Sequence, residues 1–501
     1  MAKPTQTPGL SGQSQDVTIV PRVLTLDPVT RIEGHLKISV KIARDGGQFK
    51  VVDAWSTGTL FRGVEKILEN RHPWDAVPIT QRICGVCPVS HGMAAVKTID
   101  AASGIAPPDN GRILRNLVLG SNFLQSHILH FYHLTLLDFI DGPNMAPWEP
   151  AWSADKRIDP VTSGELVNHY LSALEMRRKA HEAGAIFGGR LPAPPAFIPG
   201  GFTNKPKTAK ITQMDAHLDE LITFIREVYI PDVQQIGSFY PDYYGIGSGH
   251  QNMLAFGAFD LDATGANKLF ARGRARGGST TIDPVDVNAI LESVTRSWYD
   301  ESTNNLPPAS GDTIAEFPKG KAYSWLKAPR YAGSPYEAGP LARMWVNGDY
   351  QNGISVMDRH LARAEETLKV AQAMKTWLTE LNVSQPAYTN HQLPFSGTGH
   401  GLTEAPRGAL GHWLEFSNKK ITHYQVITPT CWNASPRDTS GLRGPIEEAL
   451  LNTPIGAINE PVELLRVVHS FDPCLSCAVH VMRADGTPHV VVTSRFGGGS
   501  S

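Results

Sequence analysis

The sequence predicts a mainly helical α+β protein, with a central bundle of long helices and small β elements near both ends of the chain. Four long segments with helical periodicity indicate the bundle, and alternating apolar and polar residues indicate the β elements. The chain has 501 residues, of which 41% are hydrophobic and 19% are charged, as is usual for a globular protein. Length alone suggests two or three domains. However, the sequence contains no repeat and no low-complexity linker, so we expect one large domain.

The first predicted element is a β-hairpin over residues 35–56. In HLKISVKIARDGGQFKVVDAWS, apolar and polar residues alternate on both sides of an Asp-Gly-Gly turn. Residues 1–20 before it are polar and lack the apolar core of a secretory signal. We interpret them as an N-terminal arm.

Helical patterns dominate the middle of the chain. Residues 61–103 predict short helices on either side of a loop that carries two cysteines. Long helices are predicted over residues 112–140, 163–189, 213–229 and 353–381, where apolar residues recur three and four positions apart. In the first of them, Gly120 and Ser121 would allow a neighbouring helix to approach closely.

The last quarter of the sequence is rich in loop-forming residues. Residues 393–413 (LPFSGTGHGLTEAPRGALGHW) read as a loop, residues 423–430 read as a strand, and residues 447–456 include a late helix. Small β elements at both ends of a helical chain follow from this pattern.

Charge and hydropathy argue against nucleic-acid binding and against a membrane-spanning segment. The formal net charge is −2, which gives no electrostatic reason to expect binding to nucleic acid. No run of about 18 apolar residues occurs, so we expect no segment that spans a membrane.

The cysteines point to metal or redox chemistry. Four of the five form two Cys-x-x-Cys pairs, Cys84 with Cys87 and Cys474 with Cys477, and Cys431 is left over. Thiolates are soft ligands for zinc, nickel, copper(I) and iron–sulfur clusters. The residues alone leave a four-cysteine zinc site and a catalytic metal site both open. Zinc ribbons usually keep both pairs in one small module, whereas 387 positions (474 − 87) separate these pairs.

The two cysteine segments, RICGVCPVSH at 82–91 and DPCLSCAVH at 472–480, resemble the signatures of the large subunit of nickel–iron hydrogenases. The resemblance covers nearly the whole chain. Among the hydrogenases of this family, the sequence resembles the respiratory uptake type. The further matching segments are DPVTRIEGH at 27–35, GTLFRGVEKIL at 58–68, LQSHILHFYHL at 124–134, KAPRYAGSPYEAGPLAR at 327–343, TEAPRGALGHW at 403–413 and TPTCWNASPRD at 428–438. The fold implied is that of the hydrogenase large subunit, and the reaction implied is the reversible oxidation H₂ ⇌ 2H⁺ + 2e⁻.

The resemblance implies a nickel ion bound by four thiolates, those of Cys84, Cys87, Cys474 and Cys477. Cys87 and Cys477 would bridge nickel to an iron that carries CO and two cyanide ligands, and Cys84 and Cys474 would be terminal on nickel. Because H₂ splits heterolytically, the site needs a base. Either the Cys474 thiolate or the guanidine of Arg407 would supply it, and Glu33 would be the proton gate beside Cys474.

Two further sets of residues are implied by motif position. Arg407 and Thr430 would donate hydrogen bonds to the cyanides, and Asp472 would anchor the arginine or the loop beneath it. The full cyanide and CO pocket would be Pro406, Arg407, Leu410, Pro429, Thr430 and Asp472. A second metal, Mg²⁺ or Fe²⁺, would be bound by Glu65, the backbone carbonyl of Val426 and His480.

Several other residues receive a structural interpretation. His91 is expected to orient groups near the cysteines rather than to bind metal. His127, His130 and His133 lie three positions apart and sweep across about a third of a helix circumference, so packing is preferred to metal binding. Cys431 and Ser126 depart from the residues common in the family, and the polarity near the iron is expected to differ accordingly.

The end of the chain resembles a removable extension. In the family, a nickel-dependent maturation endopeptidase cuts after the histidine of the second signature, here His480. The mature catalytic domain would then be residues 1–480, and residues 481–501 would be the extension, which also has strand character. Regulatory hydrogen sensors of the family are the alternative function, but they typically lack such an extension.

The partner implied is an iron–sulfur small subunit. Four of the five cysteines are assigned to nickel, and an Fe–S cluster typically needs four of its own. A membrane cytochrome b or a quinone-linked subunit is a further implied partner. The expected location is the periplasmic side of the cell membrane, after export in the folded state with the small subunit; the cytoplasm is the alternative.

Overall fold

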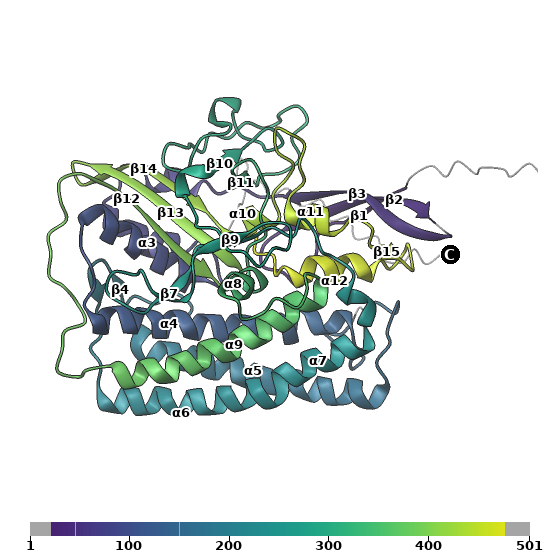
Figure 1. Ribbon diagram of the computed structural model, residues 1–501, viewed down its shortest axis with the longest axis horizontal. Coiled ribbons are helices and arrows are strands. Elements are labelled where there is room, and N and C mark those ends of the chain that lie inside the picture. Colours follow the sequence, from purple (N-terminus) through teal and green to yellow (C-terminus); the bar gives the residue numbers. More distant parts are fainter. Residues whose placement is uncertain (1–21, 46, 150, 476–501) are drawn as a thin grey trace, which may run out of the picture.

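The long helices form one layer of the molecule, and the β structure lies over it (Figure 1). The computed structural model describes residues 22–45, 47–149 and 151–475. Within them the predicted mixture of helices and strands is confirmed. The long helices are α4 (Asp109–Ile128), α5 (Pro160–Gly188), α6 (Thr208–Phe224), α7 (Ile230–Phe239) and α9 (Val356–Glu380). In this layer α4 packs against both α5 and α9, and α6 packs against the same two helices.

Small residues allow α4 to pack closely on both sides. A Cβ atom added at Gly120 would lie 2.5 Å from the sulfur of Met374 on α9, and one added at Gly184 of α5 would lie 2.9 Å from Ser121 Cβ. These distances are too short for a side chain. The close helix approach predicted at Gly120 and Ser121 is therefore present.

The predicted N-terminal hairpin is confirmed. Strands β2 (Leu36–Asp45) and β3 (Gln48–Gly58) pair antiparallel, and β1 (Arg22–Leu26) adds to the edge of β2. In β2 the buried residues are Leu36, Ile38, Val40 and Ile42, and they alternate with partly exposed residues, as expected for a sheet with one covered face. On the other side β3 pairs with β15 (Pro454–Ile455), so the two ends of the described chain meet in one sheet.

A second sheet occupies the region expected to be a loop. Residues 397–405 and 408–417 form β12 (Gly397–Ala405) and β13 (Gly408–Ser417), which pair with each other, and β14 (Lys420–Ile427) follows. The loop prediction for 393–413 was wrong because glycines dilute the strand pattern. Gly397, Gly399 and Gly401 occupy alternate positions of β12, where any Cβ would lie within 2.5 Å of the backbone of α3 (Pro88–Ser103) or the segment at its end.

Short helices and strands complete the architecture. Several of the short strands lie in the middle of the chain, where no strands were predicted. The short helices are α1 (Val64–Leu68), α2 (Ala76–Thr80), α8 (Pro340–Asn347), α10 (Pro429–Asn433), α11 (Pro445–Ala449) and α12 (Val462–Ser470). The short strands are β4 (Phe197–Ile198), β5 (Gly201–Phe202), β6 (Met253–Ala255), β7 (Ala258–Asp260), β8 (Lys268–Phe270), β9 (Gly273–Ala275), β10 (Ile290–Ser293) and β11 (Ala328–Tyr331). Single helical turns are η1 (Pro73–Asp75), η3 (Leu136–Asp138), η5 (Pro241–Tyr244), η6 (Val287–Ala289) and η7 (Glu301–Thr303), and π-helical segments are η2 (Leu129–Thr135) and η4 (Ile225–Tyr229).

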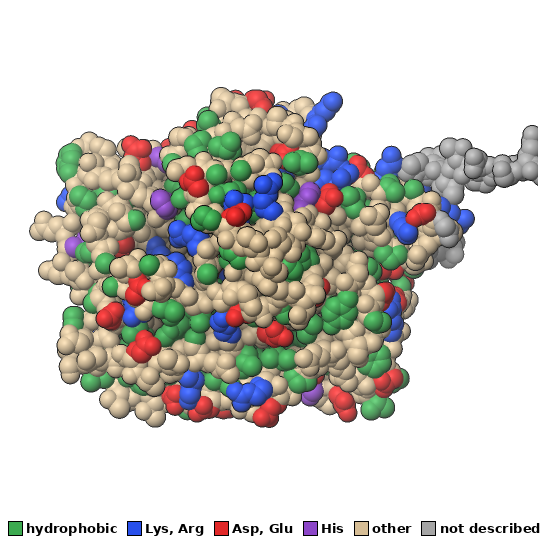
Figure 2. Space-filling view, viewed as in Figure 1, with side chains coloured by type: hydrophobic (Ala, Val, Ile, Leu, Met, Phe, Trp, Pro, Cys, Tyr) green, Lys and Arg blue, Asp and Glu red, His purple; other side chains and the backbone are tan. Residues whose placement is uncertain are grey.

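The surface carries mixed charge. On the face seen in Figure 2, acidic and basic side chains are interspersed and apolar side chains are scattered among them, which agrees with the net charge of −2. Among the described residues, no helix combines the length and the apolar character that crossing a bilayer requires.

Candidate metal centre

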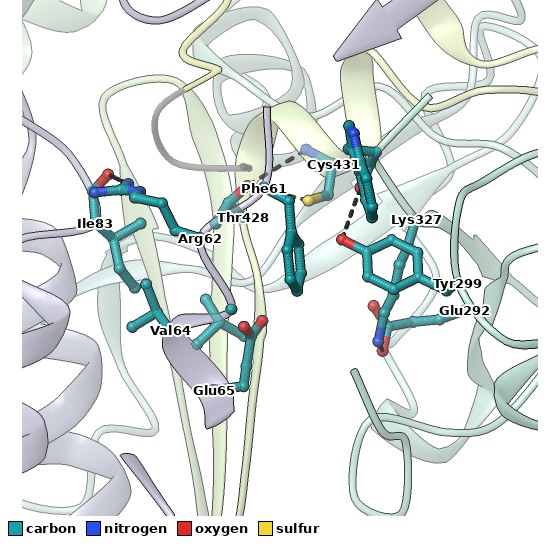
Figure 3. Close-up of a pocket in the computed structure, with 13 residues that line it drawn as sticks. Phe61, Arg62, Val64, Glu65, Ile83, Glu292, Tyr299, Lys327, Thr428 and Cys431 are labelled. Carbon is teal, nitrogen blue, oxygen red and sulfur yellow. Dashed lines mark hydrogen bonds and ion pairs between the residues drawn. The ribbon is translucent and has the colours of Figure 1, made fainter. Parts of the chain in front are cut away.

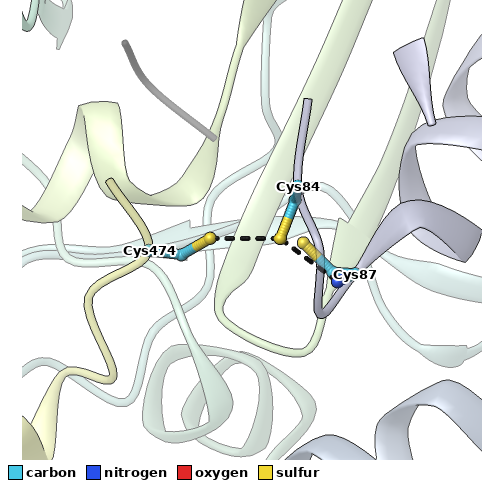
Figure 4. Close-up of side chains that lie close together, drawn as sticks. All are labelled: Cys84, Cys87 and Cys474. Carbon is cyan, nitrogen blue, oxygen red and sulfur yellow. Dashed lines mark hydrogen bonds between the residues drawn. The ribbon is translucent and has the colours of Figure 1, made fainter. Parts of the chain in front are cut away.

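Three cysteine sulfurs from opposite ends of the chain meet in the interior. The Sγ atoms of Cys84, Cys87 and Cys474 all lie within 4.8 Å of one another, and they face each other in Figure 4. The Sγ atoms of Cys84 and Cys474 are 3.2 Å apart, well beyond the S–S bond length of about 2.05 Å in a disulfide. All three residues are buried, so their sulfurs form a compact group that can bind metal.

The first pair is presented by a tight loop before α3. Cys87 is the N-cap residue of α3, with Pro88 at the first helical position. The backbone N–H groups of Val86 and Cys87 donate to Cys84 Sγ at 3.3 and 3.2 Å. Donated N–H groups and a nearby helix N-terminus both favour thiolates over thiols.

Cys474 is held by contacts to two distant segments. Leu475 N donates to the carbonyl of Glu33 at 2.6 Å, and Cys474 N donates to Thr430 Oγ1 at 3.0 Å. The Glu33 carboxylate accepts a hydrogen bond from Cys474 Sγ at 3.2 Å. The structure therefore brings the predicted proton gate into direct contact with one cysteine of the cluster.

A buried arginine lies beside the cluster. Arg407 occupies the turn between β12 and β13, is 1% exposed, and its Nη2 lies 2.9 Å from Asp472 Oδ1. Burial opposes the charge of the guanidinium, but Asp472 and the three cysteines outweigh it and raise the pKa of Arg407 well above its ordinary value. The positive charge offsets that of neighbouring thiolates, and a guanidinium held in this way is a poor base.

The predicted pocket walls also lie in the interior. Pro406, Leu410 and Pro429 are buried, and Thr430 is 2% exposed. Thr430 accepts a hydrogen bond from Cys474 N, a link that sequence reasoning did not predict. Its hydroxyl hydrogen remains available as a donor.

The donor chemistry fits a soft metal with small anionic ligands. Buried thiolates close together repel each other unless a cation compensates them, and soft sulfur donors favour nickel or iron over magnesium. In addition, Nε of Arg407 is a buried donor without a hydrogen-bond partner among the described residues. An acceptor ligand such as cyanide would satisfy this N–H.

A second pocket lies beyond the cluster and contains Glu65 and Val426. It encloses about 40 Å³, room for an ion or a water molecule. Figure 3 shows Glu65 on the same side of the pocket as Val64, with Glu292 and Lys327 across from it. Burial raises the pKa of Glu65, with Lys327 opposing the shift.

Three functional candidates around this pocket, Glu292, Gln425 and Lys327, were missed by sequence reasoning, and Cys431, which was expected near the iron, lies here as well. Glu292 is buried and accepts from Gln425 Nε2 at 2.5 Å, with Lys327 Nζ at 3.7 Å. Cys431 lines the same pocket. Lys327 and Cys431 lie within segments already singled out and Gln425 adjoins Val426, whereas nothing in the local sequence distinguishes Glu292.

The three histidines that follow each other through α4 and η2 have separate neighbours. His127 Nε2 lies 3.3 Å from Glu366 Oε1, His130 Nε2 bonds to the carbonyl of His469 at 2.6 Å, and His133 packs against Tyr170. In the part of the chain that the structure describes, the cysteine cluster is the group with metal-binding geometry. These histidines therefore pack in the helical layer, as the sequence suggested.

Two predicted ligands, Cys477 and His480, lie outside the described residues. The same holds for the N-terminal arm over residues 1–20 and for the extension over residues 481–501.

Comparison with protein families gives a match along most of the chain. The model described as nickel-dependent hydrogenase matches residues 62–157, 144–353 and 347–480, and one described as HoxL-like matches residues 23–53. Both cysteine segments, at 82–91 and 472–480, fall within the residues that the nickel-dependent hydrogenase model matches.

Curated relatives and solved structures agree with this match. The chain is 42% identical to the periplasmic [NiFeSe] hydrogenase large subunit of Desulfomicrobium baculatum, over 93% of this chain and 97% of that protein. It is 33% identical to the uptake hydrogenase large subunit of Rhizobium leguminosarum bv. viciae, over 92% and 96%. The reduced Ni-Fe-Se hydrogenase structure from D. vulgaris Hildenborough superposes with a TM-score of 0.89 at 42% identity, covering 92% of this chain and all of that one.

Proposed function

The chain belongs to the nickel-dependent hydrogenase family as a large subunit, and from this premise we propose that it oxidises H₂ to protons and electrons at a nickel–iron centre held by its cysteines. The observation that carries the proposal is the cluster of Cys84, Cys87 and Cys474, whose sulfurs lie within 4.8 Å of one another in the interior. The sequence contains no selenocysteine, so every sulfur ligand proposed is a cysteine thiolate.

Four thiolates would hold the metals. Cys84 and Cys474 would be terminal on nickel, while Cys87 and Cys477 would bridge to an iron with CO and two cyanide ligands. When bound, this centre would polarise H₂, so that one hydrogen leaves as a proton and the other keeps both bonding electrons. The chain's own residues position the ligands, hold compensating charge and carry protons away.

Proton removal is the task of Cys474 and Glu33. Between the two bases considered, the structure favours the Cys474 thiolate, because the pKa of Arg407 is raised well above its ordinary value by Asp472 and the cysteines despite burial. A proton taken up at Cys474 Sγ can pass to Glu33 Oε2 across 3.2 Å, a normal distance for proton transfer. Arg407 and Thr430 would donate hydrogen bonds to the cyanides, with Asp472 anchoring the guanidinium and Pro406, Leu410 and Pro429 as walls.

The second pocket would bind Mg²⁺ or Fe²⁺. Glu65, the Val426 carbonyl and His480 are the proposed ligands. The buried carboxylate of Glu292 adds negative charge nearby, which favours a divalent cation with oxygen ligands.

Assembly and location follow from the same premise. We propose residues 1–480 as one catalytic domain with an arm over residues 1–20, and residues 481–501 as an extension cut off after His480 by a maturation endopeptidase. The partner would be an iron–sulfur small subunit, with a membrane cytochrome b or quinone-linked subunit beyond it. The name of the D. baculatum relative specifies the periplasm, which supports export of the folded complex to the periplasmic side of the cell membrane.

The proposed function is tested by H₂-driven dye reduction. Co-expression with the small subunit and maturation factors should give a complex that contains stoichiometric nickel and reduces an artificial acceptor under H₂. A pure complex with stoichiometric zinc, no nickel and no H₂-dependent reduction would contradict the proposal. A complex with nickel that responds to H₂ but turns over only at a trace rate would instead favour the hydrogen-sensing alternative.

A further inference from the structure

A second buried arginine, Arg343 on α8, contacts the chain just before Arg407. Its side chain is 0% exposed. Nη1 donates to the carbonyl of Ala405 at 2.9 Å, and Nη2 donates to the carbonyl of Pro406 at 2.7 Å. Ala405 is the last residue of β12, and Pro406 and Arg407 form the turn that leads into β13. One guanidinium therefore holds both backbone carbonyls that precede Arg407.

Two buried carboxylates fix this guanidinium in turn. Nε and Nη2 of Arg343 donate to Glu366 on α9 at 3.0 and 2.7 Å, and Nη1 donates to Glu404 Oε2 at 2.9 Å. Together with the two carbonyls, these contacts use all five N–H donors of an arginine. Burial opposes the charge of Arg343, but Glu366 and Glu404 outweigh it and raise its pKa above the ordinary value.

The helix that carries Arg343 also packs directly against the turn. Gly339 is the N-cap residue of α8, four positions before Arg343. A Cβ atom added at Gly408, just after the turn, would lie 2.7 Å from Gly339 N, too close for a side chain. One added at Gly339 would lie 3.4 Å from the carbonyl oxygen of Arg407. The start of α8 and the Arg343 side chain thus hold the turn on both sides of Arg407.

Different residues hold the far end of the Arg407 side chain. Its Nη2 lies 2.9 Å from Asp472 Oδ1, and its Nη1 lies 3.5 Å from Ser126 Oγ on α4. Its Nε is a buried donor without a hydrogen-bond partner among the described residues. The direction of this N–H depends on both ends of the side chain. A shift of the turn would therefore re-aim it even if the contact with Asp472 were kept.

We propose that Arg343 is a positioning residue for Arg407, which fixes the turn at Pro406 and so aims the Nε–H of Arg407 at a cyanide ligand of the iron. The proposal rests on the proposed function, because the cyanide belongs to the metal centre. A side chain that only neutralised Glu366 and Glu404 could equally be a lysine. Lysine keeps the charge, but its three donors lie on one nitrogen, so it cannot hold two carboxylates and two carbonyls at once.

The test is infrared spectroscopy of the Arg343→Lys complex, purified with the small subunit. A hydrogen bond to the cyanide nitrogen changes the stretching frequency of that cyanide directly. The cyanide bands should therefore shift or broaden, and dye reduction should fall by about 10–100-fold, the usual cost of losing an outer partner at a metal site. Arg407→Lys removes the Nε–H donor itself. If Arg343 acts through that donor, adding Arg343→Lys to Arg407→Lys should move the cyanide bands no further.

Arg330→Lys is the matched control. Arg330 is also buried, and its guanidinium donates to Asp438 and to the carbonyls of Pro436 and Leu442. It therefore loses the same kind of contacts on replacement by lysine, but none of these carbonyls precedes a residue of the proposed cyanide pocket. Its cyanide bands should match those of the unmodified complex.

Three results would overturn the proposal: cyanide bands that Arg343→Lys leaves in place, equal shifts in Arg343→Lys and Arg330→Lys, or a full further shift when Arg343→Lys is added to Arg407→Lys. If Arg343→Lys does not fold, Glu366→Gln replaces it, because the amide keeps the size of the side chain and removes the ion pair at Nε and Nη2. Unchanged cyanide bands in Glu366→Gln would then overturn the proposal. An unmodified complex without cyanide bands would overturn the proposed function as well, which distinguishes the two failures.

Discussion

At the scale of single residues, the chemistry depends on how Cys474 is held. Its backbone N–H donates to Thr430 Oγ1 and its sulfur contacts both Cys84 Sγ and Glu33 Oε2, each at 3.0 to 3.2 Å. The same sulfur thus touches a second ligand candidate and a proton acceptor. Backbone contacts determine where Cys474 lies, so its side chain can be changed while the surrounding fold is kept.

Replacement of Cys474 by Ser should abolish H₂-dependent dye reduction and lower nickel content. Serine keeps the backbone hydrogen bond to Thr430 but replaces a soft sulfur ligand with a hydroxyl. Because loss of an outer partner of a metal ligand already costs about 10–100-fold, loss of a direct ligand should cost at least about 100-fold. Nickel per chain and dye reduction are the measurements.

Cys431→Ser is the matched control for this substitution. Cys431 is a buried cysteine like Cys474, but it lies in the second pocket and outside the cluster. The control should retain nickel. Full dye reduction by Cys474→Ser, or equal nickel loss in both variants, would contradict the role assigned to Cys474.

Replacement of Glu33 by Gln should slow turnover without removing nickel. The amide keeps the size of the side chain and can still accept a hydrogen bond from Cys474, but it cannot take up a proton. Loss of a general acid–base group typically costs about 10²–10⁴-fold. Dye reduction is compared with that of Glu69→Gln, where the carboxylate lost belongs to a surface pair with Lys66. Equal turnover of the Glu33 and Glu69 variants would remove Glu33 from the proton path.

At the scale of elements, one buried carboxylate joins α11 to the N-terminal sheet. Glu447 Oε1 accepts from Ser56 N on β3 at 2.8 Å and from Tyr323 Oη at 2.9 Å. Burial raises the pKa of Glu447 to about 7, although both donors oppose the shift. The junction between the end of the chain and its beginning is therefore sensitive to pH.

The free energy of unfolding should fall as the pH rises from about 4.5 to about 7. Below about pH 4.5 the carboxyl is protonated in both the folded and the unfolded chain, and the folded state keeps its proton up to about pH 7. Since the unfolded chain loses its proton first, the contribution of Glu447 decreases between these values by about 3 kcal/mol in total, at 1.36 kcal/mol per pKa unit. Denaturant unfolding of the unmodified chain and of Glu447→Gln at pH 5 and 7.5 measures it. A stability difference between the two that does not change with pH would contradict the shifted pKa.

The elements also show what could be predicted from sequence and what could not. The hairpin over residues 35–56 was predictable because alternation and the turn are both local. Strands β12 and β13 were not, because Gly397, Gly399 and Gly401 are dictated by the nearby backbone of α3, which is more than 290 positions away in the chain. The cysteine pairs were recognisable as motifs. Glu292 in the second pocket was not, because its partners there, the side chains of Gln425 and Lys327, are distant in the sequence.

At the scale of the whole molecule, both ends of the described chain converge on the same region. Strand β15 pairs with β3, and Glu33 and Cys474 form a parallel β-bridge. Cys474 is thus added to a site whose other described cysteines, Cys84 and Cys87, come from the first fifth of the chain. We infer that the last segment of the chain completes the centre, and that the proposed extension over residues 481–501 would delay this step until metal is bound.

The extension can be tested by mass spectrometry of the intact large subunit. Cleavage after His480 removes 21 residues (501 − 480). The chain purified with nickel and the small subunit should end at His480, whereas chain made without nickel should retain Ser501. Nickel-loaded, active enzyme that still carries residues 481–501 would contradict a role for cleavage in maturation.

Infrared spectroscopy of the purified complex tests the central claim most directly, because CO and cyanide bound to iron have stretching bands in a region free of protein absorption. If Cys84, Cys87, Cys474 and Cys477 hold a nickel–iron centre, the spectrum should contain one CO band and two cyanide bands, and the bands should be lost in Cys474→Ser. A spectrum without these bands, from protein that contains stoichiometric metal in the cysteine cluster, would contradict the account.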